Sequence, residues 1–131
     1  MILLTSIQDV RDVFDAIFTD EQIVGDGIFE QWFKMAVGEY SREIEPIKYN
    51  SESGTFDVEL PQYVITLLGL IVKRFYCERK YNKIIKKNNI IAKDITLNAT
   101  DSSKARAKEE LDYVNLTIKE LFSKLKTSAY N

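Results

Sequence analysis

The stretch from Leu60 to Asn89 constrains the fold more than any other part of the chain. Nearly every residue from Val64 to Val72 is apolar, and apolar residues recur through the stretch at spacings of three, four and seven. Such spacings are typical of an α-helix. Pro61 suits a first helical position, because its missing N–H would have no partner there. We therefore expect a helix from Pro61 to about Asn88, covered on several sides along its first half.

The second half of this expected helix is strongly basic. It contains seven cationic side chains against the single acidic Glu78: Lys73, Arg74, Arg79, Lys80, Lys83, Lys86 and Lys87. We expect this end to project toward water or toward a partner. The apolar run before it is less than half of the roughly 20 residues that a membrane-spanning helix needs. The sequence therefore predicts no contact with a membrane.

Charge is distributed unevenly along the chain. The net charge is −2, but residues 1–60 contain 4 lysines and arginines against 13 aspartates and glutamates, whereas residues 61–131 contain 14 against 7. A chain of 131 residues is expected to form one domain, residues 1–131, with a real core. Either the two halves pack together and neutralise each other, or copies associate acidic face to basic face, as in a head-to-tail ring.

Two helices are expected before residue 46. Ser6 is a plausible N-cap for a first helix that ends near Phe18. Residues 19–22, Thr-Asp-Glu-Gln, have the form of a capping box, which predicts that a second helix starts near Asp20. Gly25 and Gly27 oppose this start, so the helix is either interrupted there or has its main body from Gly27. The predicted core stripe of this helix, which Pro46 ends, is Ile28, Trp32, Met35, Ala36, Tyr40 and Ile44, flanked by Phe29 and Phe33.

Residues 47–58 change period. Two short alternating segments, 47–49 and 55–58, flank the turn-forming residues 50–54. The pattern fits a β-hairpin or an irregular loop. A hairpin of two strands is only marginally stable alone, so it would have to pack against the helices or against a neighbouring subunit.

A last helix is expected near the C-terminus. Asn88-Asn89 predicts a break, residues 90–97 alternate weakly and could be extended, and residues 98–103 are rich in N-cap residues, with Thr100, Asp101 and Ser102 as candidates. The helix predicted from Ser103 to Lys126 carries a heptad seam at Ala107, Leu111, Val114, Ile118, Leu121 and Leu125. Residues 127–131 should be flexible or bound to a partner. The expected fold class is mainly α, a bundle of about four helices with a possible small β-hairpin near residues 47–58.

Few residues suit catalysis or metal binding. The chain has no histidine, which removes Ser-His and Cys-His pairs and the commonest zinc ligand. The single Cys77 cannot form an internal disulfide, which fits a reducing compartment, and its place in the apolar helix favours an inert buried thiol. We therefore expect no enzyme activity, no catalytic residues, no metal site and no cofactor.

Direct contact with nucleic acid is a weaker hypothesis. Tyr76 and Tyr81 interleave with the basic run, as in grooves that follow a phosphate backbone. The protein as a whole is acidic, with a pI near 5.3, and it has no recognised nucleic-acid-binding motif. The residues singled out for contact with DNA or with other charges are Lys80, Lys83, Lys86 and Lys87.

Three features carry a resemblance to a known family. They are an aromatic-rich helix opened by the capped acidic turn at residues 19–22, an apolar helix opened by Leu60-Pro61-Gln62-Tyr63-Val64, and the exit of that helix through Phe75-Tyr76-Cys77-Glu78-Arg79. Over about residues 6–88 the chain resembles the head–tail connector (adaptor, or head-completion) proteins of tailed bacteriophages. Gly25-Asp26-Gly27 and the long last helix depart from that family's usual pattern.

The resemblance implies a structural role in the virion. Proteins of this family are made in the host cytoplasm and form a ring, typically of twelve copies, in the neck of the particle beneath the portal protein. The ring extends the channel through which DNA passes without specific binding, and the tail or stopper protein docks on it. The residues expected to contact partners are Tyr49, Asn50, Ser51, Glu52, Ser53, Gly54, Thr55 and Phe56 in the loop, and Leu121, Phe122, Leu125 and Tyr130 near the C-terminus.

Two other functions fit the sequence. One is a cytoplasmic helical interaction module, such as a small regulator that works through its C-terminal seam. The other is a nucleic-acid-binding protein that uses residues 73–87.

Overall fold

The computed structural model describes residues 4–17, 24–91 and 98–129. In chain order the elements are α1 (Ile7–Ile17), α2 (Asp26–Glu43), β1 (Tyr49–Asn50), β2 (Thr55–Phe56), α3 (Gln62–Ile91) and α4 (Asn98–Ala129). The predicted class, mainly α with a small hairpin, is confirmed.

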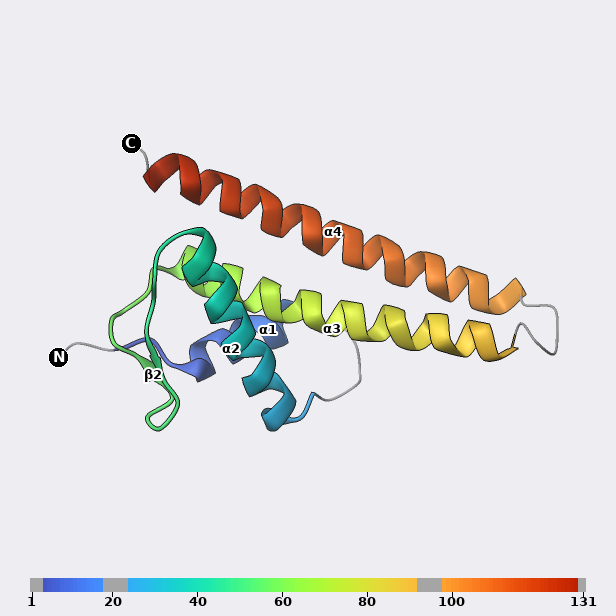
Figure 1. Cartoon of the computed structure of the whole chain (residues 1–131), viewed down its shortest axis with the longest axis horizontal. Coiled ribbons are helices and arrows are strands. Elements are labelled where there is room, and N and C mark those ends of the chain that lie inside the picture. The colour runs from blue at the N-terminus through green and yellow to red at the C-terminus, as the bar shows by residue number, and fades with distance from the viewer. Residues whose placement is uncertain (1–3, 18–23, 92–97, 130–131) are drawn as a thin grey trace.

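The helices are arranged around α3 (Figure 1). Helices α3 and α4 run antiparallel as a long pair, while α1 and α2 lie against the N-terminal half of α3. The C-terminal half of α3 and the N-terminal half of α4 extend together beyond α1 and α2. The body of the molecule is therefore several helices thick at one end and two helices thick at the other.

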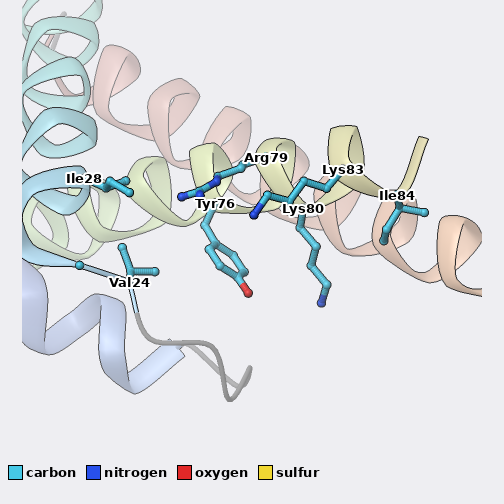
Figure 2. Close-up of a pocket in the computed structure, with 8 residues that line it drawn as sticks. Val24, Ile28, Tyr76, Arg79, Lys80, Lys83 and Ile84 are labelled. Atoms are coloured by element: carbon cyan, nitrogen blue, oxygen red, sulfur yellow. The ribbon is translucent and has the colours of Figure 1, made fainter. Parts of the chain in front are cut away.

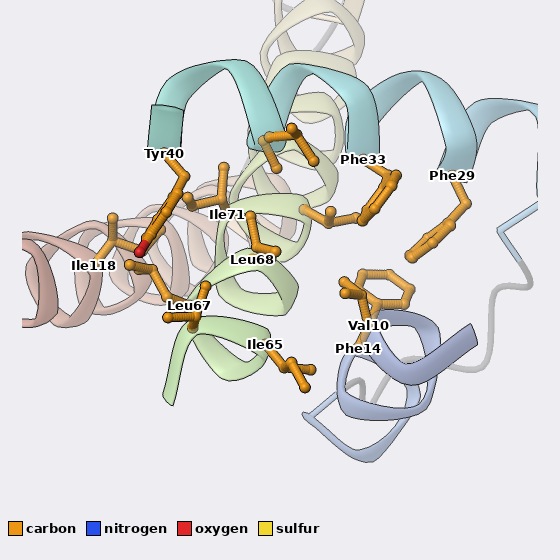
Figure 3. Close-up of a cluster of buried hydrophobic side chains, with 14 of the residues drawn as sticks. Val10, Phe14, Phe29, Phe33, Tyr40, Ile65, Leu67, Leu68, Ile71 and Ile118 are labelled. Carbon is orange, nitrogen blue, oxygen red and sulfur yellow. The ribbon is translucent and has the colours of Figure 1, made fainter. Parts of the chain in front are cut away.

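Helix α3 supplies the centre of the core. Leu67, Leu68, Ile71 and Val72 are completely buried, because α1, α2 and α4 each cover a different side of the helix. Figure 3 shows aromatic side chains of α2, the side chains of Val10 and Phe14 from α1, and Ile118 from α4 meeting around these residues. An apolar helix covered on several sides was the expectation, and it is confirmed.

Helix α1 begins where the sequence predicts. The Asp9 N–H donates to Ser6 Oγ at 3.3 Å, and the Ser6 N–H donates to Asp9 Oδ2 at 2.8 Å. This reciprocal pair satisfies two donors at the helix start, and the Asp9 carboxylate also lies at the favourable end of the helix dipole. Val10 and Phe14 then point into the core.

The described start of α2 lies close to the second of the two alternatives left by the glycines. The described helix begins at Asp26, with Gly25 as its N-cap, which is one residue before the predicted main body from Gly27. The earlier start near Asp20 and the capping box at residues 19–22 lie outside the described residues, so an interrupted helix stays a prediction. The helix ends at Glu43, and Ile44 caps it, so the stop before Pro46 is confirmed.

The predicted core stripe of α2 is partly wrong. The buried face is Phe29, Phe33, Ala36, Val37 and Tyr40. Met35 is 55% exposed and Ile28 is 38% exposed, whereas Trp32 is half-buried against the core edge. The buried face of α2 is rotated relative to the predicted stripe, because the rings of Phe29, Phe33 and Phe14 occupy the space beside α3.

The hairpin forms, and residues 5–7 hold it. Tyr49 pairs with Phe56 and Asn50 with Thr55, around a turn in which Gly54 has a φ of 70°. Residues before α1 add a third partial strand, because the Phe56 N–H donates to the Thr5 carbonyl at 2.8 Å and the Ile7 N–H donates to the Gly54 carbonyl at 2.9 Å. The expectation that two strands need outside support is therefore met within the same chain.

The boundaries after residue 88 differ from the predicted ones. Helix α3 continues through Asn88-Asn89 to Ile91, so the predicted break is wrong and residues 90–91 are not extended; residues 92–97 lie outside the described part. Helix α4 begins at Asn98, and the predicted loop with its caps at Thr100, Asp101 and Ser102 is helical. It also runs three residues past the predicted end, to Ala129. Pairing of the two helices outweighs the low helix propensity of these polar residues.

Gly69 allows α1 to approach α3 closely. A Cβ at this position would lie 2.9 Å from Val13 Cγ1 and 3.3 Å from Val13 Cβ. Valine is stiff at χ1, so α1 would have to shift. We expect Gly69→Ala to lower the free energy of unfolding by about 1–2 kcal/mol despite the better helix propensity of alanine.

Gly38→Ala is the matched control. No atom lies within 4 Å of a Cβ added at Gly38, so that change should raise stability by up to about 1 kcal/mol. Urea unfolding, monitored by far-UV circular dichroism, measures the free energy of unfolding of both variants. Equal stability of the two variants would contradict the close approach of α1.

Candidate binding surfaces

A basic pocket lies between the start of α2 and the middle of α3 (Figure 2). It has a volume of about 330 Å³. Two sides share its lining: Val24, Gly25 and Ile28 on the α2 side, and Tyr76, Arg79, Lys80, Lys83 and Ile84 on α3. We refer to these eight residues as the basic pocket.

The helical period places the α3 residues of the basic pocket together. Tyr76, Lys80 and Lys83 follow each other at spacings of four and three, so their side chains project from one face of α3. Tyr76 is buried and forms the floor, while Arg79 and Lys83 are exposed at the rim. The pocket therefore joins an apolar floor to a cationic rim.

The start of α2 adds to the positive character of the pocket. Its N-cap, Gly25, makes no side-chain capping bond. The first turn of a helix also carries the positive end of the helix dipole.

The cations of the basic pocket differ in their ion pairs. Within the described residues, Arg79 and Lys83 form no ion pair, whereas Lys80 Nζ lies 3.9 Å from Glu110 Oε2. An anionic group beside an apolar one is the chemistry that suits this pocket.

Two other cations of the basic run hold the fold together. Lys73 Nζ donates to the Ile17 carbonyl at 2.7 Å, which ties α3 to the end of α1. The Arg74 guanidinium donates twice to Glu39, at 2.9 and 2.6 Å, which ties α3 to α2. These two side chains are consequently not free to contact nucleic acid.

The structure gathers some of the predicted charge-contact residues and separates others. Lys80 and Lys83 share the basic pocket, Lys86 is exposed farther along α3, and the Lys87 side chain lies outside the described part. Sequence reasoning placed Arg79 in the basic run but did not select it as a contact residue. Its spacing of three from Tyr76 and four from Lys83 is the signal that could have identified it.

The predicted contact loop is partly core. Phe56 is only 1% exposed and half-buried Tyr49 packs against it, and both rings contact Phe33 at centroid distances of 5.7 and 4.7 Å. These two residues therefore support the hairpin from within. Asn50, Ser51, Glu52 and Ser53 are exposed, while Gly54 and Thr55 are half-buried.

Most of the predicted C-terminal contact residues also pack inside the chain. Phe122 is buried in the core, and Leu121 and Leu125 pack against it. The heptad seam of α4 faces α3, with Ala107, Val114 and Ile118 buried. Leu121 and Leu125 additionally line a shallow apolar groove of about 310 Å³ beside Tyr63. Tyr130 lies outside the described residues.

An exposed acidic segment follows the hairpin. Asp57, Val58 and Glu59 are all exposed, and Val58 is 49% exposed although it is apolar. The buried residues Phe56 and Leu60 anchor the two ends of this segment. Sequence reasoning did not single out these three residues, which we call the acidic segment. Glu59 also lines an acidic groove with Asp9 and Asp12.

The described residues offer no evident metal site or membrane span. No three of their cysteine, aspartate and glutamate side chains converge so as to hold a metal ion. No helix in the described ranges combines the length and the apolar character that crossing a membrane requires.

Cys77 lies on the buried side of α3 and is 2% exposed, as predicted. Burial, followed by the nearby Glu110 carboxylate, raises the pKa of the Cys77 thiol to about 12.

We expect the Cys77 thiol to resist a disulfide reagent at pH 8 in the folded protein, because the thiolate is the reactive form, and to react at once in 8 M urea. Fast labelling without urea would contradict the buried position; free cysteine at equal concentration is the control.

The Arg74–Glu39 pair permits a second test. Both side chains are mostly buried, and the bonds are bidentate, so Glu39→Gln should lower the free energy of unfolding by about 1–2 kcal/mol. The control is Glu30→Gln in the exposed Lys34–Glu30 pair, whose charged atoms lie 3.6 Å apart; its effect should stay below about 0.5 kcal/mol. Thermal unfolding at low salt measures the stability of both variants. Similar losses of stability in the two variants would argue against a special role for Glu39.

Comparison of the chain with protein-family models, with curated proteins and with solved structures finds no match.

Proposed function

We propose that this chain is a non-catalytic structural protein of the head–tail connector kind, which assembles with copies of itself into a ring in the neck of a tailed bacteriophage. In this proposal the ring lies between the portal protein and the tail or stopper protein, and DNA passes through it without specific binding. The sequence resemblance motivates the proposal, and a helical bundle is the fold that the resemblance implies.

The observation that carries the proposal is the placement of opposite charges at two distant positions along α3. The acidic segment precedes the start of α3 at Gln62, whereas the basic pocket is centred on Lys80. Eighteen residues of helix separate these positions, which corresponds to about 27 Å. Two complementary surfaces at different places on one chain favour head-to-tail contacts between copies, and such contacts close into rings when the rotation permits.

The projecting part of the α3–α4 pair suits a ring-forming subunit. It includes Lys86, which is exposed and which we assign to the channel through which DNA passes. On the other side of the molecule, residues 50–53 form an exposed turn, which we assign to contact with the tail or a neighbouring copy.

The alternatives have less support. A regulator that acts through the C-terminal seam would need that seam to be accessible, yet its residues pack against α3. A nucleic-acid-binding protein would use residues 73–87 as one surface, yet Lys73 and Arg74 bond to other elements. The ring-forming subunit is the hypothesis that leaves these contacts undisturbed.

The experiment that tests the proposal is size-exclusion chromatography with multi-angle light scattering. We expect either a mass near twelve times 15.2 kDa, or a smaller species that co-elutes with the portal protein encoded in the same genome. A monomer or dimer that ignores the portal protein would refute the proposal. Bovine serum albumin in place of the portal protein controls for nonspecific co-elution.

A further inference from the structure

We propose that the acidic segment of one copy docks in the basic pocket of the next copy. This inference rests on the proposed function, since it names the contact by which neighbouring subunits of the assembly would be joined. The occupant is thus a second copy of this chain, through residues 57–59.

The acidic segment is held in a fixed shape before any partner binds. The Asp57 N–H donates to the Lys48 carbonyl at 3.2 Å, and the Leu60 N–H donates to Thr5 Oγ1 at 2.7 Å. The side chains of Phe56 and Leu60 are buried on either side. A segment clamped at both ends loses little conformational entropy when it docks.

The chemistry of the acidic segment matches that of the basic pocket. The segment presents one exposed aliphatic side chain, Val58, between two carboxylates. The pocket offers an aliphatic and aromatic surface formed by Val24, Ile28, Tyr76 and Ile84, bordered by the cations of Arg79, Lys80 and Lys83. A carboxylate placed at the first turn of α2 would also meet the positive end of that helix.

The size of the pocket suits a short peptide edge. Its volume of about 330 Å³ lies at the lower end of the range for ligand-binding pockets in proteins. One valine with a flanking carboxylate is an occupant of suitable scale, whereas a large cofactor is not.

One chain cannot make this contact with itself, because α3 is a continuous helix that keeps the two surfaces about 27 Å apart. Each copy therefore has a donor surface and an acceptor surface that it cannot join to each other. The resulting interface is heterologous, and it predicts how two kinds of mutant should behave when they are mixed.

The central experiment uses one variant without an acceptor and one without a donor. Arg79→Glu with Lys83→Glu reverses the rim of the basic pocket, and Asp57→Lys with Glu59→Lys reverses the acidic segment. Each double variant alone should be monomeric, with self-association weakened by at least about ten-fold. A one-to-one mixture should again form assemblies larger than a dimer, because an intact acidic segment meets an intact basic pocket at one interface and the reversed segment meets the reversed pocket at the other.

Matched controls change the same charges elsewhere. Lys119→Glu with Lys124→Glu and Asp112→Lys with Glu120→Lys alter exposed residues of α4 and should leave assembly unchanged. Circular dichroism establishes that all variants remain folded. If the pocket and segment variants assemble like the wild type, this inference is wrong while the proposed function stands.

A cross-linking experiment covers the case in which the wild type is monomeric and the proposed function fails. Val58→Cys and Ile28→Cys are made in separate chains, mixed and oxidised mildly; the native Cys77 is buried. A disulfide-linked heterodimer formed faster than either homodimer would support the contact even without a ring. Rates equal to those of a Val58→Cys and Leu116→Cys mixture, in which Leu116 is an exposed residue of α4, would overturn it.

Discussion

Burial of the first half of α3 is the interaction on which the rest of the structure depends. About two and a half turns of this helix, residues 64 to 72, bury aliphatic side chains on several sides. Helices α1, α2 and α4 each contribute to covering them. Removing aliphatic side chains from water is the dominant favourable term in folding. The polar contacts are placed around this core: Lys73 of α3 bonds to α1, and Arg74 bonds to α2.

The elements that could be predicted are those whose sequence pattern repeats. The first half of α3 and the seam of α4 follow helical spacing over several turns, so pattern alone located them. The face of α2 could not be located in this way, because apolar residues occur nearly all around it and tertiary packing chose Phe29 and Phe33 over Ile28 and Met35. The helix boundaries near Asn88 and Asn98 also failed, since local propensity was overridden by pairing of α3 with α4.

The candidate site was partly predictable for a similar reason. The basic run was visible in the sequence, and its helical spacing places Lys80 and Lys83 on one face. The opposite wall of the pocket comes from Val24 to Ile28, some fifty residues earlier, and no local pattern connects the two. The exposure of Val58 could not be predicted either, because it depends on Phe56 and Leu60 turning inward on both sides.

The hydrogen bond from the Leu60 N–H to Thr5 Oγ1 has a consequence for the order of folding. It joins residues 55 positions apart, and closing a loop of that length costs about 3.5 kcal/mol of chain entropy beyond a constant. We expect a contact of such long range to form late, after the helices between its two residues have docked. The acidic segment takes its final shape only when this loop closes. An assembly that recognised the segment would therefore admit fully folded subunits and reject incomplete ones.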